Sequence, residues 1–231
     1  MKCATLYAGV PPRAPAPEAV GRAPLPEWDR AGPKRYVAKQ EEAAEFGARV
    51  YVAACQAGLA GAQEVIVVGD GADWIWNLAA EHFGEATEVL DYYHAAEHIW
   101  KLVPALYGEG SAAGKRWAET RCRALQAQGP RGLLRALGRR VAKDASQAEA
   151  LRLARGYFQK HRARMQYPSF RKRGLMIGSG PVEAGCKVVV GQRLKGTGMH
   201  WSVQGADAML AVRTAVLSGQ EQRIAQAARA A

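Results

Sequence analysis

The chain has 231 residues, of which 48% are hydrophobic, so it is long enough to bury a sizeable core. Its 32 Lys and Arg against 21 Asp and Glu give a formal net charge of +11. A basic excess of this size favours a polyanionic partner, most often nucleic acid. Composition alone leaves this interpretation even with a merely basic soluble protein. No apolar stretch is long enough for a signal peptide or a membrane span, which predicts a cytoplasmic protein.

The cysteines are scattered along the chain and form no CxxC pair. They are Cys3, Cys55, Cys122 and Cys186. This spacing argues against a disulfide framework or a zinc cluster, and it predicts small buried thiols in a reducing compartment.

The N-terminal part contains two predicted strands and one predicted helix. CATLYAG, residues 3–9, predicts a short strand, and residues 11–33 are so rich in Pro and Gly that they predict a long loop. KRYVAK, residues 34–39, predicts a second strand. Apolar residues at helical spacing then predict a helix from Gln40 to about Leu59.

Two further strands are expected, each followed directly by a helix. EVIVVGD, residues 64–70, is a short β-branched run that predicts a buried strand, and TEVLD, residues 87–91, predicts another. ADWIWNLAAEHF and the stretch from Tyr92 to about Tyr107 have helical patterns. Connections this short between strand and helix imply parallel strands covered by helices.

The second half of the chain is predicted to be helical up to a glycine-rich block. Residues 108–167 contain no strand pattern and are interrupted by GEGSAAG and GPRG, which predicts a helical insertion with either solvated or DNA-facing basic surfaces. Residues 168–204 end in a glycine-rich turn, a helix that opens at Pro181, and a basic hook. The tail, residues 205–231, is again predicted to be helical.

Three acids stand where ligands are commonly bound. Asp70 and Asp91 follow the two predicted parallel strands, and the carboxyl ends of such strands border the crevice of an α/β fold. Glu183 lies three residues into the helix after GSG. Each acid also has a purely structural interpretation, as a turn former or as a helix cap.

Together these acids predict a metal site. Phosphodiester cleavage and strand transfer commonly use two Mg²⁺ ions about 3.5–4 Å apart. Hard cations need carboxylate oxygens, and a strand-end aspartate with a distant helix-borne glutamate supplies them.

Two long blocks carry a resemblance to a known family. Residues 69–102, GDGADWIWNLAAEHFGEATEVLDYYHAAEHIWKL, and residues 178–202, GSGPVEAGCKVVVGQRLKGTGMHWS, resemble the ISKra group of bacterial insertion-sequence transposases. These are DDE-type enzymes of DNA recombination, encoded by mobile elements, with an RNase-H-like core: a mixed α/β sheet flanked by helices, with a large all-helical insertion.

The resemblance assigns roles to particular residues. It implies that Asp70 and Glu183 are the second and third catalytic acids and hold Mg²⁺ or Mn²⁺. Asp91 and His94 would be the DxxH pair beside that site. The partners would be transposon-end and target DNA, and the full-length protein would be a homo-oligomer.

The resemblance also divides the chain into four segments. Residues 1–107 would be the first part of the core, 108–167 the insertion, 168–204 the last part of the core, and 205–231 the C-terminal tail.

The family's first catalytic aspartate would precede the strand at CATLYAG. No upstream acid replaces it, because the candidates fall in the proline-rich segment, namely Glu18, Glu27 and Asp29. We therefore expect an N-terminally truncated transposase that is inactive alone, with an open apolar sheet edge.

A zinc metallopeptidase is a second interpretation of HAAEH, residues 94–98. His94 and His98 would bind zinc, Glu97 would be the base, and Glu183 the third ligand. This interpretation leaves Asp70 and the basic hook without roles, and packing on a helix face is the simpler expectation for His98.

A non-catalytic DNA-binding relic is a third interpretation. Its contact residues would also serve a transposase: Lys187, Arg193, Lys195 and Trp201. A base can stack on Trp201, although burial is the commoner fate of a tryptophan. Trp74 and Trp76 are two apart on a helix, so at least one is expected in the core.

Overall fold

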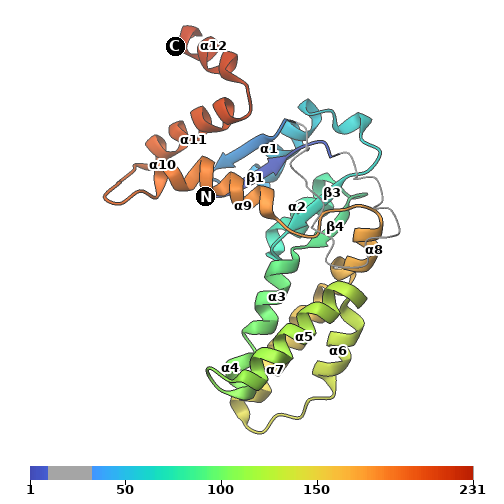
Figure 1. The fold of residues 1–231 in the computed structure, drawn as a ribbon. Helices are drawn as coiled ribbons and strands as arrows, with labels where there is room; N and C mark the ends of the chain where they lie inside the picture. Colours follow the sequence, from blue (N-terminus) through green and yellow to red (C-terminus); the bar gives the residue numbers. More distant parts are fainter. Residues whose placement is uncertain (10–32, 231) are drawn as a thin grey trace, which may run out of the picture. The chain divides into compact units, whose positions relative to one another are not determined.

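The computed structural model describes residues 1–9 and 33–230 and shows a mixed α/β protein in which helices predominate (Figure 1). The predicted loop lies outside these residues except for position 33, as do Glu18, Glu27 and Asp29. Within the described part, no helix is long and apolar enough to cross a membrane. The chain divides into two compact units: unit 1 comprises residues 1–65, 77–85 and 180–231, and unit 2 comprises residues 66–76 and 86–179.

Unit 1 is built on an antiparallel pair of strands. Strand β1 (Lys2–Leu6) pairs with β2 (Arg35–Lys39), with Cys3 opposite Ala38, so both predicted N-terminal strands are confirmed. The remaining elements that lie wholly in unit 1 are α1 (Ala43–Gln56), the 3-10 turn η2 (Leu59–Gly61), α9 (Gly180–Cys186), the π-helical segment η4 (Lys187–Gly191), α10 (Gln192–Leu194), α11 (Val203–Leu217) and α12 (Glu221–Ala230).

The core of unit 1 forms where helices cover the antiparallel pair. Helix α1 buries Phe46, Val50 and Ala54, which recur every four residues and so share one face. A second cluster joins Ala38 of β2 with Val189, Val190 and Leu210. The first set follows the helical pattern predicted from Gln40 onward.

Unit 2 is built on a parallel pair of strands. Strand β3 (Ile66–Gly69) pairs in parallel with β4 (Thr87–Leu90), which confirms the predicted strand direction. The prediction that β3 is buried is wrong for its start, since Ile66 is 39% exposed and only Gly69 is fully buried. Among the described residues β3 has one strand partner, so its chain is covered less than that of a central strand.

Helices make up the rest of unit 2 and enclose its core. They are α3 (Tyr92–Trp100), α4 (Val103–Tyr107), α5 (Ala112–Gln128), α6 (Pro130–Gly138), α7 (Ala145–Lys160), the 3-10 turn η3 (Arg162–Met165) and α8 (Tyr167–Lys172). Helix α2 (Asp73–His82) begins in unit 2 and ends in unit 1. Figure 1 shows α5, α6 and α7 side by side, and residues from all three enter one apolar core.

The single helix predicted from Tyr92 to Tyr107 is interrupted in the structure. Helix α3 ends at Trp100 and α4 begins at Val103. Pro104 has no N–H to donate to the preceding turn, so the continuous hydrogen-bond ladder stops there. The predicted breaks further along, at Gly108, Gly110 and Gly129, all have positive φ, which ends the helices around them.

Candidate functional site

The two strand-end aspartates lie next to each other in unit 2. Gly69 and Leu90 are partners in the parallel ladder, and Asp70 and Asp91 are the residues that follow them. The backbone N–H of Asp91 donates to the carbonyl of Gly69 across the strand ends, with an N···O distance of 2.7 Å. The sequence placed both acids at this edge, and the parallel register brings them together.

Asp70 is exposed and stands on a tight turn. Its Oδ1 accepts a hydrogen bond from the N–H of Ala72 at 3.0 Å. This is the turn-forming role that the sequence also allows for Asp70. Gly71 has a φ of +99°, a conformation that strains any residue with a Cβ. The turn thus fixes the aspartate's backbone while its carboxylate stays accessible to solvent.

Asp91 is instead 1% exposed, and backbone groups occupy both of its carboxylate oxygens. Oδ1 accepts the N–H of His94 at 2.9 Å, which makes Asp91 the N-cap of α3. Oδ2 accepts the N–H of Ser179, and the adjacent Tyr92 N–H donates to the carbonyl of Ile177. Asp91 therefore holds the start of α3 and the glycine-rich segment before α9.

His94 and His98 lie one turn apart on α3, and both are half-buried. Their ring centroids are 6.3 Å apart. His98 stacks on Tyr157 with centroids 3.7 Å apart, and burial, followed by the nearby Lys101 and His94, lowers the pKa of His98. This is the packing role expected for His98.

Tyr157 is a site residue that the sequence did not single out. A Cβ on Gly71 would lie 3.0 Å from its hydroxyl, and burial raises its pKa, with further contributions from Asp70 and Asp91. Its hydroxyl is buried and has no hydrogen-bond partner among the described residues. The only sequence signal was the run of aromatic residues and histidine in Tyr157, Phe158 and His161 within the predicted insertion.

Asp73, at the start of α2, is a third acid close in sequence to Asp70. Its Oδ1 pairs with Nζ of Lys160 at 2.5 Å, and this hydrogen bond lowers its pKa. Asp73 is therefore engaged by a lysine, whereas Asp70 has a backbone N–H as its hydrogen-bond donor.

Glu183 is exposed in the first turn of α9, in unit 1. Its helix lies directly against the antiparallel strands, because a Cβ on the buried Gly185 would be 2.6 Å from Thr5 Oγ1 and 3.0 Å from a ring carbon of Tyr36. The hydroxyl of Thr5 also donates to the carbonyl of Pro181 at 3.4 Å. These contacts fix the backbone that carries Glu183.

A π-helical segment follows α9, and an arginine holds it. π-helical geometry leaves backbone carbonyls without their usual partners and often occurs at functional sites. The Nε of Arg213 in α11 donates to the carbonyls of Val188 and Val189, each at 3.0 Å. No pattern in the sequence indicates this contact.

The four candidate DNA contacts lie in unit 1 and are all exposed: Lys187, Arg193, Lys195 and Trp201. The expectation that a single tryptophan is buried is wrong for Trp201, which is 40% exposed. It lies in the segment that precedes α11. Trp76, by contrast, is 5% exposed and fills the core of unit 2, as expected for one of the pair with Trp74.

Zinc chemistry would need a denser set of ligands than the structure provides. The described residues contain no group of three or more His, Cys, Asp or Glu that could hold a metal ion. A catalytic zinc ion takes three protein ligands, whereas Mg²⁺ is often held by one or two carboxylates together with water and substrate phosphates.

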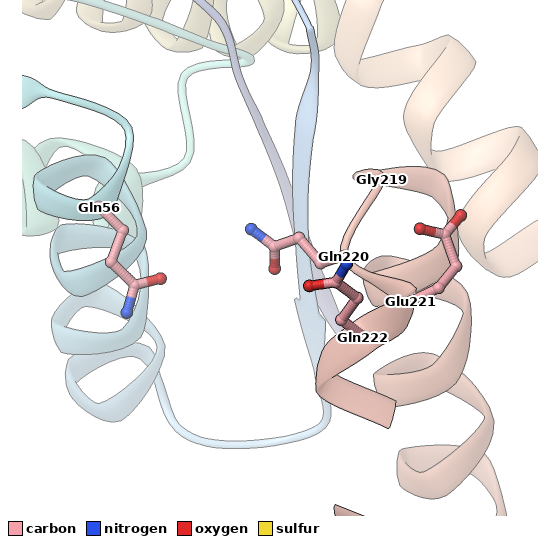
Figure 2. A pocket seen from close by; sticks show the side chains of 5 residues that line it. All are labelled: Gln56, Gly219, Gln220, Glu221 and Gln222. Carbon is pink, nitrogen blue, oxygen red and sulfur yellow. The ribbon is translucent and has the colours of Figure 1, made fainter. Parts of the chain in front are cut away.

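Unit 1 contains a hollow of about 560 Å³ (Figure 2). Gln56 of α1 faces the turn between α11 and α12 across it. The lining consists of Gln56, Gly219, Gln220, Glu221 and Gln222. It contains none of the predicted site residues.

Comparison with known proteins places the chain in a family. Residues 55–229 match UPF0236, which is described as an uncharacterised protein family. No curated protein and no solved structure matches the chain. The matched region includes Asp70, Asp91, Glu183 and every candidate DNA contact. The chain therefore belongs to the UPF0236 family.

Proposed function

We propose that this protein is the RNase-H-like catalytic part of a DDE-type transposase of a bacterial insertion sequence, which cleaves and joins DNA strands with Mg²⁺ or Mn²⁺. The observation that carries the proposal is the pair of acids at the ends of adjacent parallel strands. There Asp70 is exposed and Asp91 organises the surrounding backbone. Acids in this position border the ligand crevice of α/β folds.

The accessible acids fit a magnesium ion that keeps water and phosphate ligands. Asp70 is the acid of unit 2 that would hold it, because Asp91 already uses both oxygens for backbone N–H groups. The resemblance implies Glu183 as a further metal ligand. Bound metal would activate the attacking oxygen and stabilise the leaving oxygen of a phosphodiester. This chain's residues would bind the metal and keep the backbone around it fixed.

The proposal requires a mixed sheet. The structure contains an antiparallel pair, β1–β2, in unit 1 and a parallel pair, β3–β4, in unit 2. Within the described residues each strand has one strand partner, so edges remain at which a strand with the first catalytic aspartate would pair. DNA sequence upstream of the Met1 codon that encodes such a strand would support this part of the proposal.

DNA binding rests on the exposed basic residues and Trp201 of unit 1. Lysine and arginine contacts to phosphates release counterions, so affinity for DNA should fall steeply as salt rises. Replacing Lys187, Arg193 and Lys195 together with Gln should weaken DNA binding and reduce the salt slope. Because these residues are exposed, a non-catalytic DNA-binding relic remains the second candidate function.

Mn²⁺ binding separates the two candidates. Titration of the purified chain, followed by electron paramagnetic resonance, should show binding that weakens about tenfold or more in Asp70→Asn and in Glu183→Gln. Glu97→Gln and Glu45→Gln are matched controls, since each removes an exposed carboxylate from the same unit as its counterpart. All four variants should still bind DNA.

Each outcome decides between the candidates. Mn²⁺ binding that is unchanged in Asp70→Asn and Glu183→Gln, with DNA binding intact, would reject the catalytic proposal and favour the relic. Loss of metal binding only in a His94→Gln or His98→Gln variant would favour the peptidase. A chain that binds neither metal nor DNA would exclude both nucleic-acid functions.

A further inference from the structure

Two of the four free thiols meet in unit 1, although they are far apart in sequence. Cys3 lies in β1 and Cys186 is the last residue of α9, and each is half-buried. Their side chains form a hydrogen bond with each other. The other two cysteines differ, because Cys55 is exposed and Cys122 is buried in the core of unit 2. The expectation of small buried thiols therefore holds only for Cys122.

The contact between Cys3 and Cys186 belongs to a longer seam between α9 and β1. Thr5 and Cys3 are two residues apart in the strand, so their side chains share one face. Thr5 Oγ1 donates to the carbonyl of Pro181 and also lies against Gly185, the residue before Cys186, while Cys3 bonds to Cys186 itself.

Gly185 keeps this seam tight. Its missing side chain lets the α9 backbone approach to the point where a Cβ would be 2.6 Å from Thr5 Oγ1. Moving α9 away from β1 would therefore break the close backbone contact at Gly185. The contact between α9 and β1 therefore fixes the backbone that carries both sulfur atoms.

The two thiols have unequal chemistry, which suits one of them to react first. The hydrogen bond from Cys3, together with the charge of Lys195, lowers the pKa of Cys186 to about 7. The same hydrogen bond raises the pKa of Cys3, which keeps its proton and donates it. Burial raises the pKa of Cys122 to about 11, so that thiol is much less reactive.

We propose that Cys3 and Cys186 form an intramolecular disulfide when a peroxide reaches them, so that oxidation staples α9 to β1. The Cys186 thiolate attacks a peroxide oxygen and displaces hydroxide, which leaves a sulfenic acid on Cys186. The Cys3 sulfur then attacks the Cys186 sulfur, the S–S bond forms, and water leaves with the Cys3 proton. Two electrons pass from the sulfur atoms to the peroxide, and with H₂O₂ two waters form in total. This modification site does not depend on the proposed function.

The test is mass spectrometry of the full chain after brief treatment with one equivalent of hydrogen peroxide. Intact protein should lose two hydrogens in mass, and titratable thiols should fall from four to two. Trypsin without reductant should then release one joined peptide, residues 3–13 linked to residues 174–187. A melting temperature that rises on oxidation, and returns with reductant, should accompany the link.

Variants separate the proposed pair from other thiol oxidation. Cys3→Ser and Cys186→Ser should each abolish the joined peptide and the shift in melting temperature. Cys55→Ser is the matched control and should leave both unchanged, since its thiol is exposed on α1. Links from Cys186 to Cys55, links between two chains, or Cys186 oxidised to sulfinic acid without a joined peptide would each overturn the proposal. Wild-type protein gives the decisive readout, so a variant that fails to fold does not remove the test.

Discussion

The carboxylate of Asp91 accepts a hydrogen bond from the backbone N–H of Ser179, 88 residues further along the chain. Its other oxygen caps α3 through the N–H of His94. Ser179 is the last residue of unit 2, and α9 with Glu183 begins at the next residue. Within the DxxH motif, Asp91 thus caps α3 and holds the backbone at Ser179. These two hydrogen bonds account for the aspartate without any chemistry at the His94 ring.

Replacing Asp91 should cost more than the loss of an ordinary helix cap. Asp91→Ala removes an N-cap, worth about 1 kcal/mol, and a hydrogen bond to a charged group, worth about 1.5–3 kcal/mol. Asp144→Ala is the control, because Asp144 only caps α7 through Gln147 N–H and should cost about 1 kcal/mol. Urea unfolding followed by circular dichroism measures both. Equal losses in the two variants would show that the bond to Ser179 contributes nothing.

Two tyrosines whose hydroxyl groups are buried make a matched pair for measuring the free-energy cost of a hydroxyl. The hydroxyl of Tyr167 donates to the carbonyl of Leu90 at 3.1 Å, whereas that of Tyr157 has no partner among the described residues. Tyr167→Phe should therefore destabilise by about 1 kcal/mol or more, because it leaves a buried carbonyl unpaired. Tyr157→Phe should be neutral or stabilising, because it removes a desolvated group that has no bond.

Urea denaturation of the two phenylalanine variants checks this pair. A loss for Tyr157→Phe as large as that for Tyr167→Phe would contradict the unpaired hydroxyl. If Tyr157→Phe is neutral in stability but weakens Mn²⁺ or DNA binding, the hydroxyl beside Asp70 serves a ligand instead. In that case Tyr157 joins Asp70 as a binding residue of unit 2.

Replacing Arg213 of α11 should lower the free energy of unfolding, because its side chain bonds to two backbone carbonyls. Arg213→Lys loses the planar fork that reaches the carbonyls of Val188 and Val189, and we expect a cost of about 1–3 kcal/mol. Arg152→Lys is the control, since Arg152 makes an exposed pair with Glu149 and should leave stability nearly unchanged. Thermal unfolding compares the two. A small effect at Arg213 would mean that water satisfies the π-helical carbonyls equally well.

The sequence predicted the features that depend on local pattern. Asp70 and Asp91 were placed correctly because β-branched runs predict short strands, and short strand–helix connections force those strands to be parallel. The strands β1 and β2 were also predicted, and α1 followed from helical spacing, whereas the antiparallel pairing of the two strands was not predicted.

Contacts between distant segments had no such signal. Nothing local indicates that Tyr157 reaches Asp70, that Cys3 meets Cys186, or that Arg213 holds a π-helical segment. The pattern from Gly108 to Tyr167 predicted only helices and contained no signal that would place Tyr157 near the strand ends. Each of these contacts depends on tertiary packing that composition and periodicity do not encode.

His161 makes the stability of the protein depend on pH. It is 1% exposed, and burial, followed by the charges of Arg164 and Lys160, lowers its pKa to about 4. An unfolded histidine has a pKa of about 6.5, so between these values the unfolded chain binds a proton that the folded chain does not. Stability from this group is therefore present above about pH 6.5 and falls as the pH drops toward 4.

His161→Gln should flatten that decline, because glutamine carries no charge at either pH. Urea unfolding at about pH 7 and about pH 5 should show a smaller difference in stability for the variant than for the wild type. His200→Gln is the control, since His200 is exposed and its variant should keep the wild-type difference. Acids such as Glu41, whose pKa is lowered by Arg49, also contribute less to folding stability at low pH. The difference between the wild type and His161→Gln therefore isolates the contribution of the histidine. An unchanged difference in His161→Gln would show that the buried ring takes up its proton without unfolding.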